Sequence, residues 1–116
     1  MAASARVICA SEALVDGGAG VRFSIERDGR TLSAFAVRHN GAVRAYLNRC
    51  AHVGIELDWQ PGQFFDPETG MLMCATHGAL YDPATGVCRA GPCVGGRLIP
   101  VPVVERDGLV ELQQDD

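Results

Sequence analysis

The stretch CATHGALYD, at residues 74–82, is the most informative part of this sequence, and the related stretch CAHVG occupies residues 50–54. Each stretch begins with a cysteine, has a histidine two or three positions later, and then a glycine. Two of the three histidines in the chain therefore lie within three residues of a cysteine. Because thiolate and imidazole are favoured ligands of several metals, this pairing predicts a metal centre held by two loops.

Four side chains are the candidate ligands, namely Cys50, His52, Cys74 and His77. Two thiolates can hold one iron of a [2Fe–2S] cluster while two imidazoles hold the other. A Cys2His2 zinc site uses the same ligand types, although zinc fingers more often pair cysteine with cysteine and histidine with histidine. A glycine near each histidine favours the cluster, because glycine lets backbone N–H groups approach inorganic sulfide closely.

The rest of the chain has the pattern of antiparallel β structure. Residues 22–27, 31–38 and 42–48 alternate apolar and polar side chains, which is typical of half-buried strands. Asp28-Gly29 and Asn40-Gly41 separate these runs, and such dipeptides are the strongest short signals of a β-hairpin. Three consecutive strands joined by two tight turns are therefore expected.

Near the C-terminus, residues 98–104 predict a further strand, which Pro100 and Pro102 restrict to an edge or irregular position. Asp107-Gly108 then turns the chain into residues 109–112. Only residues 11–15 indicate a helical turn. The sequence thus predicts an all-β fold.

Two similar segments flank the second cysteine–histidine box. Residues 65–70 read FDPETG and residues 81–86 read YDPATG. Aspartate suits the first position of a turn, proline presets φ at the next, and glycine accepts positive φ at the exit. Each segment is therefore predicted to form a tight hairpin loop, and shared turn chemistry explains the likeness better than duplication does.

Composition excludes several classes of function. The chain of 116 residues is 47% hydrophobic and 21% charged, as in ordinary globular domains, and its net charge is −4. Its basic residues are scattered rather than gathered in a stripe, so no nucleic-acid partner is expected. No apolar run approaches the roughly 20 residues of a membrane span, and residues 1–13 lack the apolar core of a secretion signal. We therefore expect a cytoplasmic protein without a membrane partner.

Together the two boxes resemble the Rieske [2Fe–2S] family, and Gly91-Pro92 is similar to the proline loop that covers the cluster in that family. The resemblance spans most of the chain. It implies a Rieske-like antiparallel β-sandwich with a small cluster-binding subdomain formed by two loops. We expect residues 1–116 to form a single domain, with the cluster-binding subdomain at about 49–97 inserted in the basal β-sheets. It also implies one [2Fe–2S] cluster per chain, on the four candidate ligands.

The resemblance is greatest to the small soluble ferredoxins of Rieske oxygenase systems. It implies a one-electron carrier with a low-potential cluster, passing electrons from a flavin reductase to an oxygenase or other oxidoreductase. The chain is not expected to be an enzyme alone, because a terminal oxygenase also needs an iron on two histidines and a carboxylate. Only His39 remains for that purpose.

An alternative is a small non-catalytic subunit or redox-sensing module that resembles the small subunit of nitrite reductase. Members of that group often lack the four ligands, all of which are present here. Reversible one-electron reduction would favour a carrier or a sensor over a structural subunit.

Other residues receive roles through the same resemblance. Tyr81 matches a tyrosine that can hydrogen-bond a cysteine sulfur, and Ala79 stands where high-potential relatives have a hydroxyl donor. An apolar patch around the two histidines is expected to dock the partner. Its members would be Val53, Ile55, Ala79 and Pro92. Charge changes on strands away from the loops, at Arg22 or Arg27, should leave electron transfer unchanged.

Five cysteines, an odd number, in a reducing compartment argue against a disulfide framework. Cys88 and Cys93 are therefore expected to be free thiols, with a disulfide as the alternative, and Cys9 a small core residue. We expect His39 to be a solvated turn residue and Trp59 to anchor packing.

Overall fold

The computed structural model describes residues 6–50, 56–58, 60, 62–74, 78–92 and 95–113. Within these ranges the chain is almost entirely β, with one short 3-10 turn. The elements in chain order are β1 (Arg6–Ala10), η1 (Ser11–Ala13), β2 (Val21–Arg27), β3 (Arg30–His39), β4 (Ala42–Leu47), β5 (Leu72–Met73), β6 (Leu80–Tyr81), β7 (Cys88–Ala90), β8 (Val103–Arg106) and β9 (Leu109–Leu112). The predicted all-β class is confirmed.

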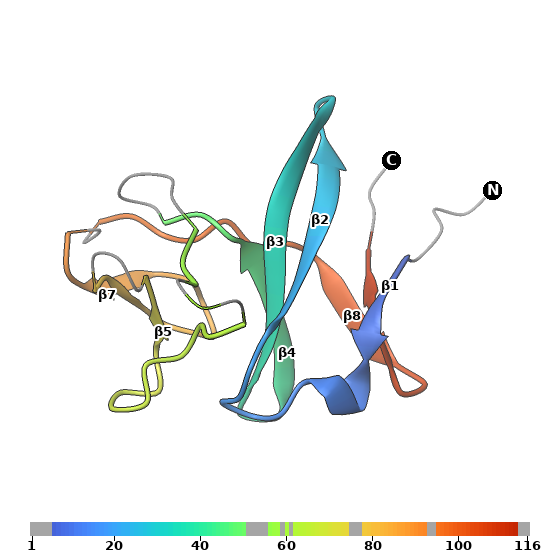
Figure 1. The fold of residues 1–116 in the computed structure, drawn as a ribbon, viewed down its shortest axis with the longest axis horizontal. Coiled ribbons are helices and arrows are strands. Elements are labelled where there is room, and N and C mark those ends of the chain that lie inside the picture. Colours follow the sequence, from blue (N-terminus) through green and yellow to red (C-terminus); the bar gives the residue numbers. More distant parts are fainter. Residues whose placement is uncertain are drawn as a thin grey trace.

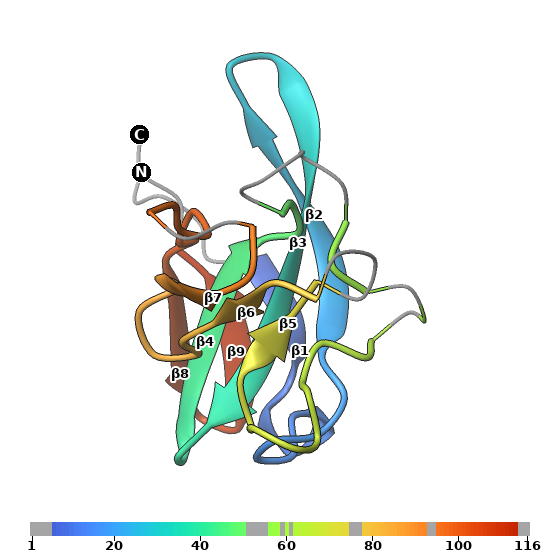
Figure 2. The same cartoon turned by 90° about the vertical axis from the view of Figure 1, so that its left-hand side faces the viewer.

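The described strands form three antiparallel sheets, which we call the outer, central and third sheets. The outer sheet has the order β1-β9-β8, the central sheet β2-β3-β4, and the third sheet β5-β6-β7. Figure 1 shows the central sheet between the other two, with the outer sheet on the right and the third sheet on the left. Seen from the third sheet, in Figure 2, the β2–β3 hairpin extends well beyond both neighbours.

The middle of strand β3 is buried on both faces because the central sheet is covered there on both sides. Ala34 and Ala36 belong to the core shared with the outer sheet, whereas Phe35 and Val37 belong to the core that contains the third sheet. All four residues are fully buried. This run of apolar residues is what a strand needs when both of its faces are covered.

The three predicted hairpin turns are confirmed. Asp28, Asn40 and Asp107 have φ between 51° and 53°, and the glycine after each also has positive φ. Two successive residues in the left-handed region match the right-handed twist of paired strands. The predicted helical turn is also present, as η1.

Both predicted Asp-Pro loops also form, with the same hydrogen bonds. Gly70 N donates to Asp66 O at 2.8 Å, and Gly86 N donates to Asp82 O at 2.7 Å. The second loop joins β6 to β7. These loops therefore fix the ends of the short strands in the third sheet.

The prediction of one strand over residues 98–104 was wrong in its bounds. Leu47 N donates to Ile99 O and Val101 N donates to Ala45 O, so this segment runs along β4 without forming a regular strand. Regular pairing begins only with β8, at Val103. The reason is that Pro100 and Pro102 have no N–H to donate to a ladder.

Candidate metal centre

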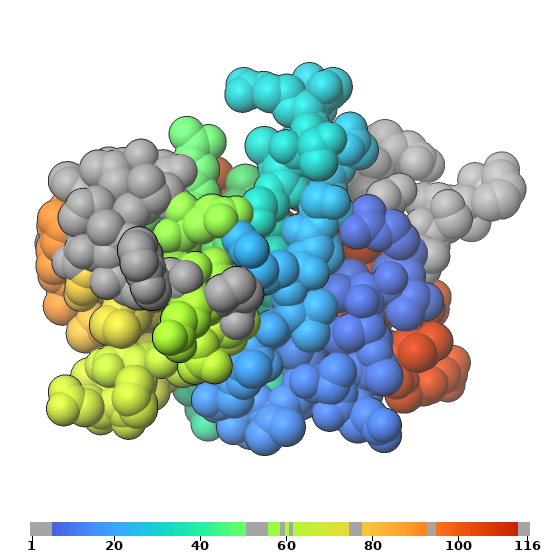
Figure 3. Space-filling view, in the orientation of Figure 1, coloured from blue at the N-terminus to red at the C-terminus, as the bar shows by residue number. Residues whose placement is uncertain are grey.

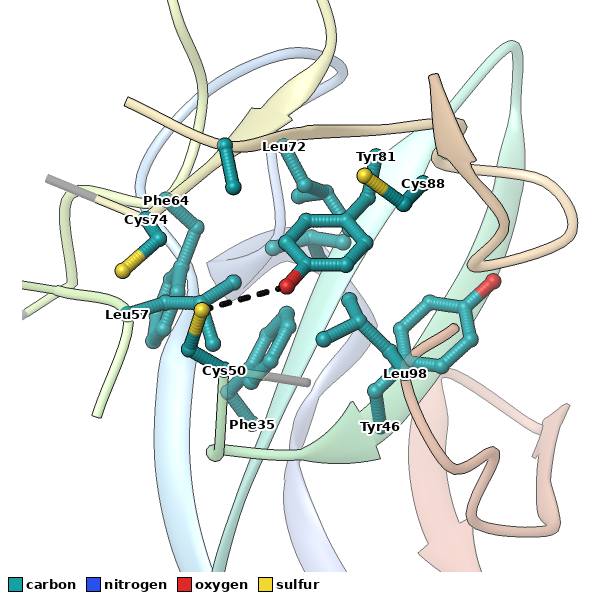
Figure 4. Packing of buried hydrophobic residues seen from close by; sticks show 12 residues of the cluster. Phe35, Tyr46, Cys50, Leu57, Phe64, Leu72, Cys74, Tyr81, Cys88 and Leu98 are labelled. Atoms are coloured by element: carbon teal, nitrogen blue, oxygen red, sulfur yellow. Dashed lines mark hydrogen bonds between the residues drawn. The ribbon is translucent and has the colours of Figure 1, made fainter. Parts of the chain in front are cut away.

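Cys50 and Cys74 reach the same core from different elements. Cys50 follows the end of β4 by three residues, and Cys74 comes directly after β5. Their exposed fractions are 1% and 0%, and both belong to the core cluster that contains Phe64 and Leu72. In Figure 4 their sulfur atoms lie on one side of this cluster, near Leu57.

The second box is a short loop whose two ends are joined by hydrogen bonds. Gly78 N donates to Cys74 O at 2.7 Å, and Cys74 N donates to Ala79 O at 2.9 Å. Gly78 has φ of +70°, which a residue with a side chain rarely adopts. Backbone hydrogen bonds thus join the residues on either side of the second histidine.

A second glycine packs against this loop. A Cβ atom on Gly91 would lie 2.9 Å from the Cα of Ala79, so only glycine allows the two backbones to approach this closely. Gly91 and Pro92 are the residues that resemble the proline loop of the Rieske family. The described part of that loop therefore lies against the end of the second box.

Tyr81 supplies a polar contact to one of the two buried cysteines. Its hydroxyl oxygen lies 3.2 Å from the sulfur of Cys50, as the dashed line in Figure 4 shows. The ring itself is fully buried. A thiolate at Cys50 would accept this hydrogen bond, so the expected contact of Tyr81 with a cysteine sulfur is present.

Several predicted residues lie outside the described ranges. They are His52, His77, Val53, Ile55, Trp59 and Cys93. The joint ligand set therefore stays a prediction. Among the residues that the structure does describe, no three histidine, cysteine or acidic side chains gather as a metal site.

Two expectations near the site were wrong. Cys88 is disulfide-bonded rather than a free thiol. Ala79 was placed in an exposed docking patch, but it is fully buried because it packs against Gly91. Pro92, in contrast, is exposed as expected.

The remaining candidates lie away from the two boxes. His39 ends β3, where its ring stacks on Phe65 with 6.5 Å between ring centroids and contacts the side-chain amide of Asn40. It is only partly exposed, so it is less solvated than expected. Cys9 is partly buried against the core of the outer sheet, and this burial raises the pKa of its thiol.

Sequence reasoning missed a buried polar pair beside the first box. Asn48 and Asp58 are buried, and the side-chain Nδ2 of Asn48 donates to Oδ1 of Asp58 at 2.9 Å. The available signal was their position, since Asn48 precedes Cys50 by two residues and Asp58 closes the segment after the box. No periodicity predicts that two such distant residues meet.

Comparison with known proteins places the chain in a family. The model of the Rieske [2Fe-2S] domain matches residues 4–105. The chain belongs to the Rieske [2Fe-2S] domain family. A search of curated proteins found no match.

Solved structures of Rieske proteins share the fold at low sequence identity. The ferredoxin of carbazole 1,9a-dioxygenase from Nocardioides aromaticivorans IC177 is 23% identical, with a TM-score of 0.72, over 97% of this chain and 100% of that one. The Sphingomonas yanoikuyae B1 ferredoxin is 24% identical, with a TM-score of 0.69 and the same coverage. The terminal oxygenase from the same Nocardioides system is 22% identical, with a TM-score of 0.71, but the match spans 30% of that chain.

Membership in the Rieske family implies a [2Fe–2S] cluster, and the described residues fit one. Two buried thiols project from neighbouring loops, and a tyrosine hydroxyl is within reach of one of them. Thiolates in an apolar setting with a nearby hydrogen-bond donor are what such clusters require.

No helix in the described ranges has the length and hydropathy needed to cross a bilayer.

Proposed function

We propose that this Rieske protein is a one-electron carrier that holds one [2Fe–2S] cluster on Cys50, His52, Cys74 and His77. The two cysteines would bind one iron and the two histidines the other. The observation that carries the proposal is the meeting of Cys50, Cys74 and the Tyr81 hydroxyl in one buried core. Bound there, the cluster would supply reversible one-electron chemistry.

The chain's own residues have a supporting role toward such a cluster. Burial of the sulfur atoms excludes water from the cysteine side. The backbone hydrogen bonds at the ends of the second box help to hold Cys74 in place. The Tyr81 hydroxyl would donate to Cys50 most strongly when the cluster is reduced, because the charge on sulfur is then most negative.

A carrier is a better reading of these residues than a complete oxygenase. With two histidines assigned to the cluster, His39 is the remaining one, and its ring is stacked on Phe65 beside a turn. A mononuclear iron would need two histidines and a carboxylate. The residues left over therefore favour electron transfer to another protein.

The proposed partners are a flavin reductase as donor and an oxygenase as acceptor, in the cytoplasm. Support for the acceptor comes from a related structure, a complex of reduced oxygenase and oxidized ferredoxin in carbazole 1,9a-dioxygenase. The matched chain of that complex is 21% identical to this one, with a TM-score of 0.68, over 91% of this chain and 89% of that one. A low midpoint potential is proposed as well, because Ala79 brings no hydroxyl donor to the second box.

The test begins with cluster content. Protein purified in air is expected to be red-brown and to contain about two irons and two acid-labile sulfides per chain. It should be reduced and reoxidised by one electron, with the electron paramagnetic resonance signal of a Rieske cluster. A colourless protein that keeps stoichiometric zinc after reconstitution with iron and sulfide would contradict the proposal.

Partner transfer is the second stage of the test. The loaded protein should couple NADH oxidation by a flavin reductase to turnover of a Rieske oxygenase. The matched control is Cys74→Ala, which removes one thiol and is expected to abolish both the colour and the coupling. A loaded protein that cycles reversibly but transfers electrons to no acceptor would favour a redox sensor instead.

A further inference from the structure

A hydrogen-bonded pair of buried polar side chains connects residues that precede and follow the first box in the sequence. Asn48 and Asp58 are the two buried polar or charged residues in the described part of the chain, with exposed fractions of 3% and 7%. The Asp58 side chain itself has no exposed surface. Because burying a carboxylate costs free energy, its retention here calls for compensating contacts.

Each oxygen and nitrogen of this pair has a defined partner. Asn48 Nδ2 donates to Asp58 Oδ1 at 2.9 Å, while Asn48 Oδ1 accepts from Leu57 N at 2.8 Å. Asp58 Oδ2 accepts from Gly62 N at 2.9 Å, and Arg22 Nε lies 3.3 Å from the same oxygen. Exchanging only one side chain, an amide for a carboxylate or the reverse, would therefore leave a donor facing a donor or an acceptor facing an acceptor.

The pair closes the segment that contains the first box. Asn48 precedes Cys50 by two residues, and Leu57 and Asp58 follow the box. Asn48 is also anchored to the central sheet, because its backbone N donates to Ser33 O at 2.9 Å. The two ends of the segment from 48 to 58 are thus tied to each other, and the Asn48 end is also tied to β3.

We propose that Asn48 and Asp58 are positioning residues, whose hydrogen-bonded pairing fixes Cys50 relative to the Tyr81 hydroxyl and thereby sets the potential of the cluster. The proposal rests on the cluster ligation by Cys50 proposed above. An apolar pair could fill the same space at less desolvation cost, but it would give the segment no directional contacts. Because hydrogen bonds are directional, the pair can hold the Cys50 sulfur at a fixed distance from the Tyr81 hydroxyl.

A swap of the two side chains tests the pairing. In Asn48→Asp, two carboxylates face each other. In Asp58→Asn, one amide N–H must face another donor, either on Asn48 or on Leu57 N or Gly62 N. In the double variant Asn48→Asp/Asp58→Asn, aspartate 48 accepts from Leu57 N and from the new amide, whose oxygen accepts from Gly62 N. All of these hydrogen bonds return, and the net charge is unchanged.

The measurements are made on the loaded protein and on the apoprotein. Each single variant is expected to lose its cluster to a chelator about tenfold faster or more, which corresponds to about 1.4 kcal/mol. Each should also have a shifted midpoint potential and an altered visible circular dichroism spectrum. The double variant should return the potential, the spectrum and the rate of cluster loss to near the wild-type values.

Glu105→Gln is the matched control. It breaks a contact between the central and outer sheets, in which Nη2 of Arg38 donates to the carboxylate of Glu105 on β8 at 2.6 Å. It is expected to lower stability without moving the potential. If the single variants behave like this control, with reduced stability but unchanged potential, the pair is merely structural and the proposal is overturned.

The remaining outcomes separate this proposal from the proposed function. A wild-type protein that takes up no cluster defeats the proposed function, whereas a loaded wild type whose double variant is not restored defeats only the positioning role. If a single variant does not fold, Arg22→Gln provides a milder change, because it removes the Arg22 contacts with Asp58 and Glu56 and leaves the hydrogen bond of the pair intact. It should release the cluster faster than wild type, and an unchanged rate would count against the proposal.

Discussion

The hydroxyl oxygen of Tyr81 lies 3.2 Å from the sulfur of Cys50, in a core where both residues are at most 1% exposed. The contact joins the two halves of the site, because Cys50 follows the central sheet and Tyr81 belongs to β6 in the third sheet. A hydrogen bond to a cluster sulfur stabilises the reduced state, which carries more negative charge. This one contact therefore links packing between sheets to the chemistry of the proposed cluster.

Tyr81→Phe is expected to lower the midpoint potential of the cluster. Loss of a hydrogen bond worth about 1 kcal/mol to the reduced state corresponds to roughly 40 mV for a one-electron couple. Protein-film voltammetry measures the shift. The control is Tyr46→Phe, since Tyr46 lies in the same core but donates to Pro83 O at 2.7 Å. Equal shifts in both variants would contradict a specific role for the Tyr81 hydroxyl.

Ala79→Ser should raise the potential, because a hydroxyl at this position can donate to a sulfur of the cluster. Ala79 is fully buried beside Gly91, so the new hydroxyl has little access to water. The shift is expected to be tens of millivolts, as for a single hydrogen bond.

Ala34→Ser is the control for this change, because Ala34 is equally buried but belongs to the core of the outer sheet. It should cost stability and leave the potential unchanged. A wild-type midpoint near the top of the Rieske range, roughly +300 mV, would contradict the low-potential assignment itself.

The sequence predicted those features that depend on neighbouring residues. Asp28-Gly29 and Asn40-Gly41 specify their turns locally, since aspartate, asparagine and glycine are the residues that tolerate positive φ best. The positions of Cys50 and Cys74 in one core followed from the spacing and family resemblance of the two boxes. The turns need no knowledge of distant contacts, whereas the meeting of the two cysteines was expected only because of the family resemblance.

The features that escaped prediction depend on contacts between distant residues. The Asn48–Asp58 pair joins the two sides of a loop, and Arg38 connects Leu14 O and Glu105 across separate elements. No local pattern encodes either set. The disulfide at Cys88 was only the alternative expectation, because the expected reducing compartment was given more weight than the position of the cysteine.

Gly91→Ala is expected to destabilise the site through a steric clash. The new Cβ would lie 2.9 Å from Ala79 Cα, at a φ of +95° that alanine adopts poorly. Overpacking of this kind costs about 1–3 kcal/mol in addition to the backbone strain. Chemical denaturation of the apoprotein and the rate of cluster loss measure the two effects.

Gly95→Ala separates strain from clash. Gly95 has a φ of +98°, but among the described residues, its chain neighbours aside, no atom lies within 4 Å of its added Cβ. It should therefore show only the cost of positive φ, about 1 kcal/mol. If the two variants are equally stable, the close approach of Gly91 to the second box is not important.

The Arg38–Glu105 pair predicts a pH-dependent contribution to stability. Hydrogen bonding from Arg38 holds the pKa of the Glu105 carboxyl below its ordinary value. A carboxyl whose pKa is lower in the folded state stabilises the protein above its unfolded pKa, and this contribution is lost as pH falls through the folded value. Wild type should therefore be more stable than Glu105→Gln near pH 7, by no more than about 1 kcal/mol for a partly exposed pair. The difference should vanish in acid. Denaturant titrations across the acid range check the sign, and a difference that grew in acid would contradict it.

The structure changes which residues are suitable for testing the expected docking surface. Ala79 is buried, so Pro92 is the described member of the expected patch that a partner can contact. Arg22 is unsuitable as a remote control, because it forms ion pairs with Glu56 and Asp58 beside the first box. In the space-filling view of Figure 3, the tip of the β2–β3 hairpin stands clear of the rest of the molecule, so Arg27 remains a suitable control.

Pro92→Glu is expected to slow electron transfer to the partner several-fold without loss of the cluster, because it places a charge in an interface that should be desolvated. Stopped-flow reduction by the reductase, and reoxidation by the oxygenase, measure the rates. Val7→Glu is the matched control. It makes the same change of charge at an apolar residue that is 51% exposed, on β1 at the opposite end of the molecule from the third sheet. If both variants slow transfer equally, the effect is one of net charge rather than of docking at Pro92. If neither does, the partner binds elsewhere on the protein.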